Sequence, residues 1–313
     1  MSAAGREKDV SLFIYDELMG HVPNPGFSTP GASKSFHTID ANGLRHTGTD
    51  PGPGEQGAIL AVGDSYTYGD EVRDEDTWPA QLQRLTGRPV LNGGVTGYGF
   101  DQMVLRAEQL TARHKPSVVI VSFIAHDIVR TEFRRLWWLD KPWFAIEGTE
   151  LVLKGVPVPR RNRLPAGFKR RIQDVLVRMP WHFQSLVGYH ARAHPSGHGL
   201  VLAERLIGRL VRLRAETGVK IIVMAQHEHT TWITEAVSRF NRRIATHVLD
   251  CAAAYGLGVL DTFQRFATEP NPLDFYANAH MNARGNAAIA SLLAATMPAL
   301  LARQTSETPG SIA

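Results

Sequence analysis

Short apolar runs alternate with amphipathic segments along most of the chain. The runs are rich in Val, Ile and Leu, and they occupy residues 58–63, 89–94, 117–123, 220–226 and 257–261. The segments between them repeat apolar residues at helical spacing, at residues 76–85, 101–114, 199–216 and 232–256. Continuous apolar strands alternating with amphipathic helices are typical of a parallel sheet covered on both faces. The pattern therefore predicts an α/β fold around a parallel five-stranded sheet.

Three segments depart from this alternation. Residues 1–57 contain a stretch rich in Pro and Gly, which favours a loop-rich lead-in. Residues 137–197 interrupt the alternation with an expected hairpin that turns at Glu147 and Gly148, followed by a basic helical stretch. We interpret residues 137–197 as an insertion on the rim of a single domain at residues 58–302. The polar residues 303–313 are expected to fray.

Composition narrows the class of protein without naming a partner. With 43% hydrophobic and 20% charged residues among 313, the chain is ordinary for a globular protein. A formal charge of +4 is too small to indicate nucleic-acid binding. The single cysteine, Cys251, excludes an internal disulfide and a cysteine-rich metal site.

The sequence also bears on the compartment. No apolar run approaches the roughly 18 residues that a membrane-spanning helix needs, and the first residues lack the apolar stretch of a secretory signal. We therefore expect no transmembrane segment and a cytoplasmic protein. A periplasmic or secreted location is expected instead if a leader has been removed. The oligomeric state is not predicted.

Two polar residues follow predicted strands at the edge where an α/β sheet binds ligands. Ser65, in AILAVGDSYTYG, comes directly after the first strand, and His280 follows the last strand in DFYANAHMNARG. A serine nucleophile needs a base, and His is the usual one because it titrates near neutrality. Gly97, in LNGGVTGYG, could bring a bare N–H against an oxyanion. Each residue alone is equally compatible with a turn, a helix start or a loop.

Taken together, the motifs resemble the SGNH hydrolase superfamily of GDSL-like lipases and esterases. GDSYTYG is similar to its block with the nucleophilic serine, NGGVTGYG to its oxyanion-glycine block, SFIAHD to its third block and HMNARGNAAIA to its histidine block. They follow the family's order over residues 58–290. The resemblance implies a three-layer α/β/α sandwich of the flavodoxin-like type, a Ser65 nucleophile with a His280 base, and neither cofactor nor metal.

Two positions differ from the family's pattern. Where the third block carries an oxyanion-binding Asn, this chain has His126, which can donate a hydrogen bond as a neutral ring or as an imidazolium; alternatively, Asp127 is the important residue and His126 only faces the pocket. Where the family places its acid, this chain has Ala277 and Asn278. In a serine protease triad, Asp→Asn lowers turnover about 10⁴-fold.

The missing acid leaves several alternatives for orienting His280. Asn278 accepts a hydrogen bond through its carbonyl, Asp274 swings in from six residues upstream, or a main-chain carbonyl leaves a Ser-His dyad. A gain of activity in Asn278→Asp is expected if that position is the acid site. The enzyme is otherwise slow, a dyad or inactive.

Other residues near the predicted rim are candidates for the substrate pocket, namely Tyr66, Asp127 and His227. The QHEHTTW segment lacks the spacing of a helical HExxH zinc site, so metal binding is not favoured. RTEFRRLWWLDKPWF mixes arginines with aromatics, which either stack on a sugar or bury the rim insertion. For at least half of these aromatics, burial is the interpretation we favour.

The expected function is a serine esterase acting on a carboxylic ester through an acyl-enzyme at Ser65. Ser65, Gly97 and His126 would bind the oxyanion. A small-molecule or glycan ester is the expected substrate, with a short acyl or acetyl group. The alternatives are an O-acyltransferase that transfers the acyl group to a glycan, and a catalytically impaired glycan-binding protein of the same fold.

Overall fold

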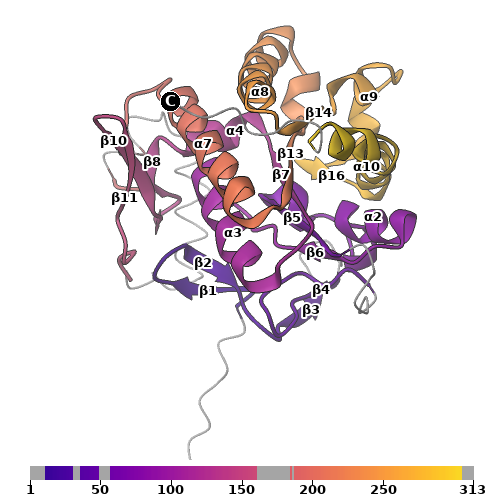
Figure 1. Ribbon diagram of the computed structural model, residues 1–313, viewed down its shortest axis with the longest axis horizontal. Helices are drawn as coiled ribbons and strands as arrows, with labels where there is room; N and C mark the ends of the chain where they lie inside the picture. The colour runs from indigo at the N-terminus through magenta and orange to yellow at the C-terminus, as the bar shows by residue number, and fades with distance from the viewer. Residues whose placement is uncertain (1–10, 31–35, 49–56, 161–183, 185–186, 305–313) are drawn as a thin grey trace, which may run out of the picture.

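The central sheet has five parallel strands in the order β14-β13-β7-β5-β6 (Figure 1). The computed structural model describes residues 11–30, 36–48, 57–160, 184 and 187–304. Each strand lies within one of the apolar runs that predicted it. The strands are β5 (Ile59–Gly63), β6 (Val90–Asn92), β7 (Val118–Phe123), β13 (Lys220–Ala225) and β14 (Gly258–Asp261).

Helices cover both faces of this sheet. Side chains of successive strand residues enter two separate apolar clusters, as Val119 and Val121 do on one face and Val118 and Ile120 on the other. A strand buried on both faces is apolar throughout, which explains the continuous runs in the sequence. The first face is covered by α3 (Phe100–His114), α7 (Gly199–Thr217) and α8 (Glu235–Ala254), the second by α2 (Trp78–Thr86) and α10 (Ala283–Arg303). The predicted three-layer α/β/α fold is confirmed.

The strand order determines where a site can form. β5, the first strand of the sheet, lies between β6 and β7, so the chain winds outward in opposite directions from it. In open α/β sheets the loops at such a switch point separate and leave a crevice at the carboxyl ends of the strands. The loops after β5 and β7 therefore border the crevice, with Ser65 on one and His126 on the other.

The lead-in is more ordered than its composition indicates. It contains the hairpins β1 (Phe13–Asp16) with β2 (Gly20–Pro23) and β3 (Ser28–Pro30) with β4 (Phe36–Thr38). An isolated antiparallel bridge then joins Arg45 to the edge strand β6. The lead-in thus packs against the domain through its hairpins and this bridge.

The rim insertion is built from short strands. Its expected hairpin is confirmed: Glu147 pairs with Glu150, and Gly148 in the turn has a φ of 61°. The basic helical stretch predicted after the hairpin and most of the polar tail lie outside the described residues. Its strands are β9 (Leu139–Asp140), β10 (Trp143–Glu147), β11 (Glu150–Lys154) and β12 (Ala191–Arg192). β8 (Phe133–Leu136), just before the insertion, pairs with β9 and β12.

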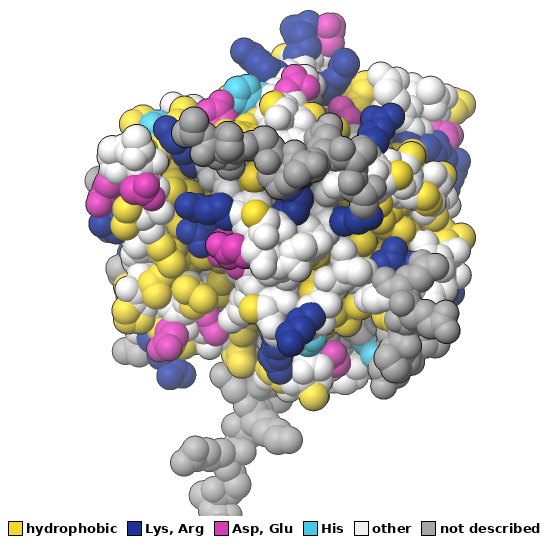
Figure 2. Space-filling model, in the orientation of Figure 1, with side chains coloured by type: hydrophobic (Ala, Val, Ile, Leu, Met, Phe, Trp, Pro, Cys, Tyr) yellow, Lys and Arg dark blue, Asp and Glu magenta, His cyan; other side chains and the backbone are white. Residues whose placement is uncertain are grey.

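One helix of the described residues, α10, is long and apolar enough to span a membrane by length and composition. It packs along α2 and contributes Ile289, Leu293 and Met297 to the core under the sheet. Its apolar character therefore has an explanation within the core. On the face shown in Figure 2, basic and acidic side chains are interspersed with apolar ones.

Candidate active site

Ser65 begins the short helix α1 (Ser65–Tyr68) at the carboxyl end of β5. Asp64 caps this helix by accepting a hydrogen bond from the N–H of Tyr66 at 2.9 Å. The turn is possible because residue 63 is glycine: a Cβ there would lie 2.2 Å from Thr67 Oγ1 and 2.6 Å from the Ser122 carbonyl oxygen. Such contacts would force the helix away from the strand, so Gly63 allows the close approach that places Ser65 at the rim.

His280 lies beside Ser65 although it is far from it in the sequence. It begins β16 (His280–Met281), which pairs with β15 (Tyr276–Ala277) in a tight hairpin. In the turn, Asn278 takes the left-handed conformation that Asn tolerates better than most residues, with a φ of 54°. His280 Nε2 lies 2.8 Å from Ser65 Oγ, so the two residues are within hydrogen-bond distance.

Tyr66 supports the histidine hairpin. Its hydroxyl donates to the carbonyl oxygen of Ala279 at 2.7 Å, and its ring lies 5.3 Å from the His280 ring, centroid to centroid. Burial is the main cause that raises the pKa of Tyr66 well above its ordinary value. We expected Tyr66 to line a substrate pocket; the structure instead places it beneath His280, where it positions the hairpin.

The two residues considered as the acid do not fill that position in the structure. Asp274 lies in the 3₁₀ helix η3 (Pro272–Phe275), and its carboxylate accepts from Asn271 at 2.7 Å. The Asn278 amide turns away from the histidine ring and donates to Glu71 Oε2 at 3.5 Å. Glu71 Oε1 lies 3.8 Å from His280 Nδ1, the ring nitrogen opposite Ser65.

The sequence did not single out Glu71, because the family's acid lies beside the histidine. The available signal was the acidic pair Asp70-Glu71, which directly follows the serine block. Asp70 Oδ2 lies 4.0 Å from His280 Nε2, and its other oxygen accepts from the Thr96 hydroxyl at 2.6 Å. Burial raises the pKa of Asp70, against the lowering effects of His280 and Thr96. Two carboxylates thus flank the imidazole.

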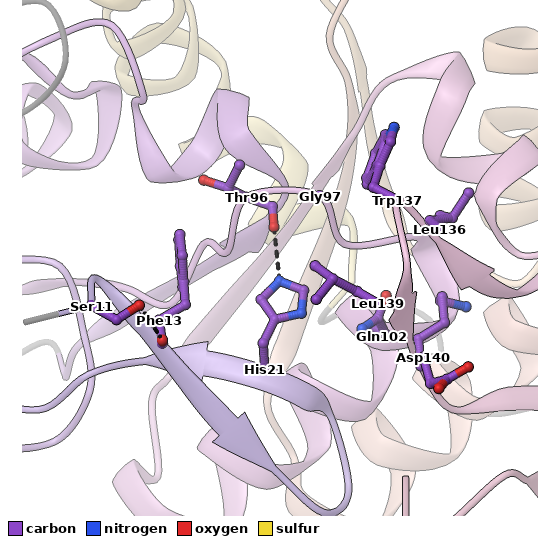
Figure 3. A pocket seen from close by; sticks show the side chains of 11 residues that line it. Ser11, Phe13, His21, Thr96, Gly97, Gln102, Leu136, Trp137, Leu139 and Asp140 are labelled. Carbon is purple, nitrogen blue, oxygen red and sulfur yellow. Dashed lines mark hydrogen bonds between the residues drawn. The ribbon is translucent and has the colours of Figure 1, made fainter. Parts of the chain in front are cut away.

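Gly97 follows Thr96 and borders a cavity of about 350 Å³ (Figure 3). Its φ is 81°, and a Cβ at this position would lie 3.2 Å from the ring of Trp137. The cavity lies between the first hairpin of the lead-in and the rim insertion. Most of its open wall is apolar, from Phe13, Leu136, Trp137 and Leu139.

His126 is held by a carboxylate that the sequence did not single out as a partner. It lies in the first turn of α4 (Ala125–Arg130), and its Nδ1 is 2.9 Å from Glu228 Oε2. Burial alone would raise the pKa of Glu228, but the hydrogen bond and charge of His126 outweigh it and lower that pKa. Asn241 donates to the same carboxylate at 3.1 Å. The His126 side chain remains 59% exposed at the crevice.

Asp127 is placed elsewhere than the expected pocket. Its carboxylate is completely buried and accepts from the N–H of Ile124 at 2.8 Å and from Arg130 Nη1 at 2.6 Å. The same Arg130 atom lies 3.6 Å from Asp64, the cap before Ser65. Burial, followed by the nearby charge of Asp64, raises the pKa of Asp127. Asp127 therefore holds Arg130, and Arg130 links the segment after β7 to Asp64 after β5.

His227 also lies outside the crevice. Its side chain is 1% exposed, and its Nε2 is 2.8 Å from Asp261 at the end of β14. The neighbouring Glu228 turns toward His126 instead, because adjacent residues at a strand end point in different directions. Within the described ranges, no group of three or more His, Cys, Asp or Glu residues could hold a metal ion.

Aromatic residues of the rim insertion pack both within it and on the main core. Phe144 is buried in the apolar cluster on the first face of the sheet. Trp138 contacts Tyr189 edge to face at a centroid distance of 5.0 Å, and Trp143 contacts His194 in the same way at 5.6 Å. Trp137 lines the cavity beside Gly97 and also lies under the guanidinium of Arg130.

Several solved structures are similar to this chain. A lipase/acylhydrolase from Enterococcus faecalis is 13% identical, with 82% of this chain and 99% of that chain covered and a TM-score of 0.46. An acetylxylan esterase from Geobacillus stearothermophilus is 15% identical, with coverages of 83% and 99% and a TM-score of 0.45. A family 3 carbohydrate esterase from Clostridium thermocellum is 14% identical, with coverages of 79% and 98% and a TM-score of 0.42.

No curated protein matches the chain. The model of the GDSL-like Lipase/Acylhydrolase family matches residues 61–288, which include Ser65, Gly97, His126 and His280. This span covers the rim insertion, the histidine hairpin and all of the sheet except the first two residues of β5, and it leaves out the lead-in. The chain therefore belongs to the GDSL-like lipase and acylhydrolase family.

Proposed function

We propose that the protein is a serine carboxylic ester hydrolase that forms an acyl-enzyme at Ser65. The observation that carries this proposal is the 2.8 Å distance between Ser65 Oγ and His280 Nε2. In the tautomer with its proton on Nδ1, His280 accepts from the serine hydroxyl and can act as its general base. Membership of the family supports the same class of reaction.

The reaction proceeds in two halves. Ser65 Oγ attacks the ester carbonyl carbon while its proton passes to His280 Nε2. The tetrahedral intermediate collapses with cleavage of the bond to the alcohol oxygen, which leaves with the proton from His280. Water then attacks the acyl-enzyme with His280 again as base, and the acid product and the free serine are released.

The oxyanion of each intermediate would be held at the crevice between the loops after β5 and β7. We assign the donors as the N–H groups of Ser65 and Gly97 together with the His126 side chain. The positive φ of Gly97 and its closeness to Trp137, which a Cβ would approach to 3.2 Å, explain why this position is a glycine. One such donor is typically worth about 10²–10³ in kcat.

A short acyl ester is the proposed substrate class. Because His280 protonates the leaving oxygen, the alcohol lies on its side of Ser65, and the acyl group lies toward Gly97. The apolar cavity of about 350 Å³ beside Gly97 supports an acyl group there, since binding pockets of ligands begin at about 300 Å³. We propose a sugar as the alcohol part of the ester, and its esters are to be compared with those of simple alkanols as substrates.

The proposal is tested by the rate of nitrophenol release from nitrophenyl esters of increasing acyl length. We expect turnover by the wild type and a loss of at least about 10³-fold in both Ser65→Ala and His280→Ala. Ser196→Ala and His247→Ala are the matched controls, because these exposed residues lie away from the crevice, and both should keep wild-type rates.

Equal rates in the wild type, Ser65→Ala and His280→Ala would refute the proposal. A fluorophosphonate labels an activated serine without knowledge of the substrate, so labelling of the wild type but not of Ser65→Ala is expected. Acetylated oligosaccharides and alkyl acetates, compared at equal concentration, then test the sugar assignment.

A further inference from the structure

We propose that Glu71 is the carboxylate that orients His280, so that the acid of the catalytic triad comes from the loop after α1 and not from the histidine hairpin. The inference rests on the proposed function, because it concerns how Ser65 and His280 work together. It concerns a positioning residue, which acts on substrate only through the imidazole.

The two ring nitrogens of His280 face different partners. Nε2 faces Ser65 Oγ, whereas Nδ1 is buried, has no hydrogen-bond partner within the described part of the chain, and lies 3.8 Å from Glu71 Oε1. Asp70 is also close, but it faces Nε2, the nitrogen on the serine side. Glu71 is therefore the carboxylate placed to hold a proton on Nδ1 while Nε2 stays free to accept from Ser65.

The residue at position 278 fits this arrangement. The Asn278 amide donates to Glu71 Oε2 at 3.5 Å, so it supports the carboxylate from the side away from the ring. A carboxylate at position 278 would instead place two like charges side by side, which disfavours ionisation of both. Asn278 therefore donates a hydrogen bond to the carboxylate that takes the place of the family's acid. That carboxylate comes from the loop after α1.

The loop that carries Glu71 is held firmly on both sides. The guanidinium of Arg45, whose side chain is fully buried, donates to the carbonyl oxygens of Tyr68 and Val72, each at 2.7 Å. It also donates to Gly69 and, at 2.9 Å, to the carboxylate of Asp74. A loop fixed before and after Glu71 restricts the positions that its carboxylate can take relative to His280.

The carboxylate has two effects on the reaction. It keeps His280 in the tautomer that leaves Nε2 unprotonated toward Ser65, and it stabilises the imidazolium that forms when His280 takes the serine proton. No proton passes to Glu71. Both effects raise kcat, and neither adds a contact to the substrate.

The test is steady-state kinetics of Glu71→Gln, a nearly isosteric change that removes the charge. We expect kcat to fall by about 10²–10⁴-fold, with KM within about threefold of the wild type. In a His280→Ala background the same change should lower kcat by less than about threefold, because residues that act as a unit are not additive. Glu71→Asp, which keeps the charge, should retain a higher kcat than Glu71→Gln.

The matched control is Glu75→Gln, an exposed carboxylate a few residues further along the chain, which should keep the wild-type kcat. Asn278→Asp alone should bring no gain. Wild-type kcat in Glu71→Gln, a full additional loss in the His280→Ala background, or a gain in Asn278→Asp would each overturn the inference. If Ser65→Ala and His280→Ala are inactive while Glu71→Gln is not, this inference alone fails; full activity in Ser65→Ala refutes the proposed function itself.

Discussion

Two residues at the site differ from the family's pattern, and each is paired with a glutamate. His126 stands in place of an Asn and contacts Glu228, while Asn278 stands in place of an Asp and donates to Glu71. In both cases a residue from a distant part of the chain supplies the charge. Under the proposed function, these two contacts would compensate for the departures from the family's pattern.

The pairing of His126 with Glu228 limits which ring nitrogen can donate to the oxyanion. With Nδ1–H donated to Glu228, Nε2 carries a proton only in the imidazolium form. An amide donates without this requirement, so kcat/KM in His126→Asn should be at least that of the wild type.

The measurement is steady-state kinetics with a nitrophenyl ester, with His247→Asn as the control on the exposed surface of α8. His126→Ala removes the donor altogether and should lose about 10²–10³-fold in kcat. Wild-type kcat in His126→Ala would show that this side chain does not contact the oxyanion.

Among the elements, the junction of β5 with α1 determines where the nucleophile lies. Five buried residues of β5 lead into a helix of only four residues, and the turn between them admits no side chain at position 63. Arg130 of α4, which Asp127 holds within the same helix, lies 3.6 Å from Asp64 and so joins this junction to the element that carries His126. Ser65 and His126 are thus positioned by one connected framework.

Gly63→Ala tests this junction. Its Cβ would meet both Thr67 and the Ser122 carbonyl, so we expect a destabilisation of about 1–3 kcal/mol and a loss of kcat as Ser65 is displaced. Urea unfolding and ester hydrolysis measure the two effects. The control is Gly208→Ala in α7, where a Cβ meets nothing within 4 Å; it should stabilise by about 0.5–1 kcal/mol. Equal stability and rate in Gly63→Ala and wild type would refute this account.

At the scale of the whole molecule, the lead-in is part of the working domain although the family model begins only at residue 61. Arg45 is the link: it pairs with the edge strand β6 through its main chain and with the loop bearing Glu71 through its side chain. The first hairpin of the lead-in forms one wall of the cavity beside Gly97.

Arg45→Met keeps much of the side-chain volume but removes the guanidinium and leaves Asp74 buried without its partner. We expect the free energy of unfolding to fall by about 3–5 kcal/mol, as for other broken buried ion pairs, and kcat to fall with the loss of the loop's anchor. Arg73→Met, whose side chain is 65% exposed on the same loop, should change stability by less than about 0.5 kcal/mol. A stable and fully active Arg45→Met would contradict the role given to the lead-in.

The sequence was most informative where local patterns are strong. The five strands and the covering helices followed from apolar periodicity, and the turn at Gly148 from its flanking residues. It was least informative about polar partners. Asp127 and His227 looked like pocket residues because they follow strands, yet each is bound to a charged neighbour away from the crevice. Periodicity indicates which face of a helix or strand a residue lies on. The hydrogen-bond partner of a polar side chain depends instead on the conformation of the loops.

The sequence by itself determined the sheet, its covering layers, the strand ends that carry Ser65 and Gly97, and the segment before the last helix that carries His280. These follow from the burial of apolar side chains, which is written into local periodicity. Only the tertiary structure decided that Glu71 lies against His280 and that Glu228 lies against His126. These contacts join segments that are distant in the chain. The distances between the paired side chains depend on the conformations of the intervening loops, which contacts such as those of Arg45 restrict.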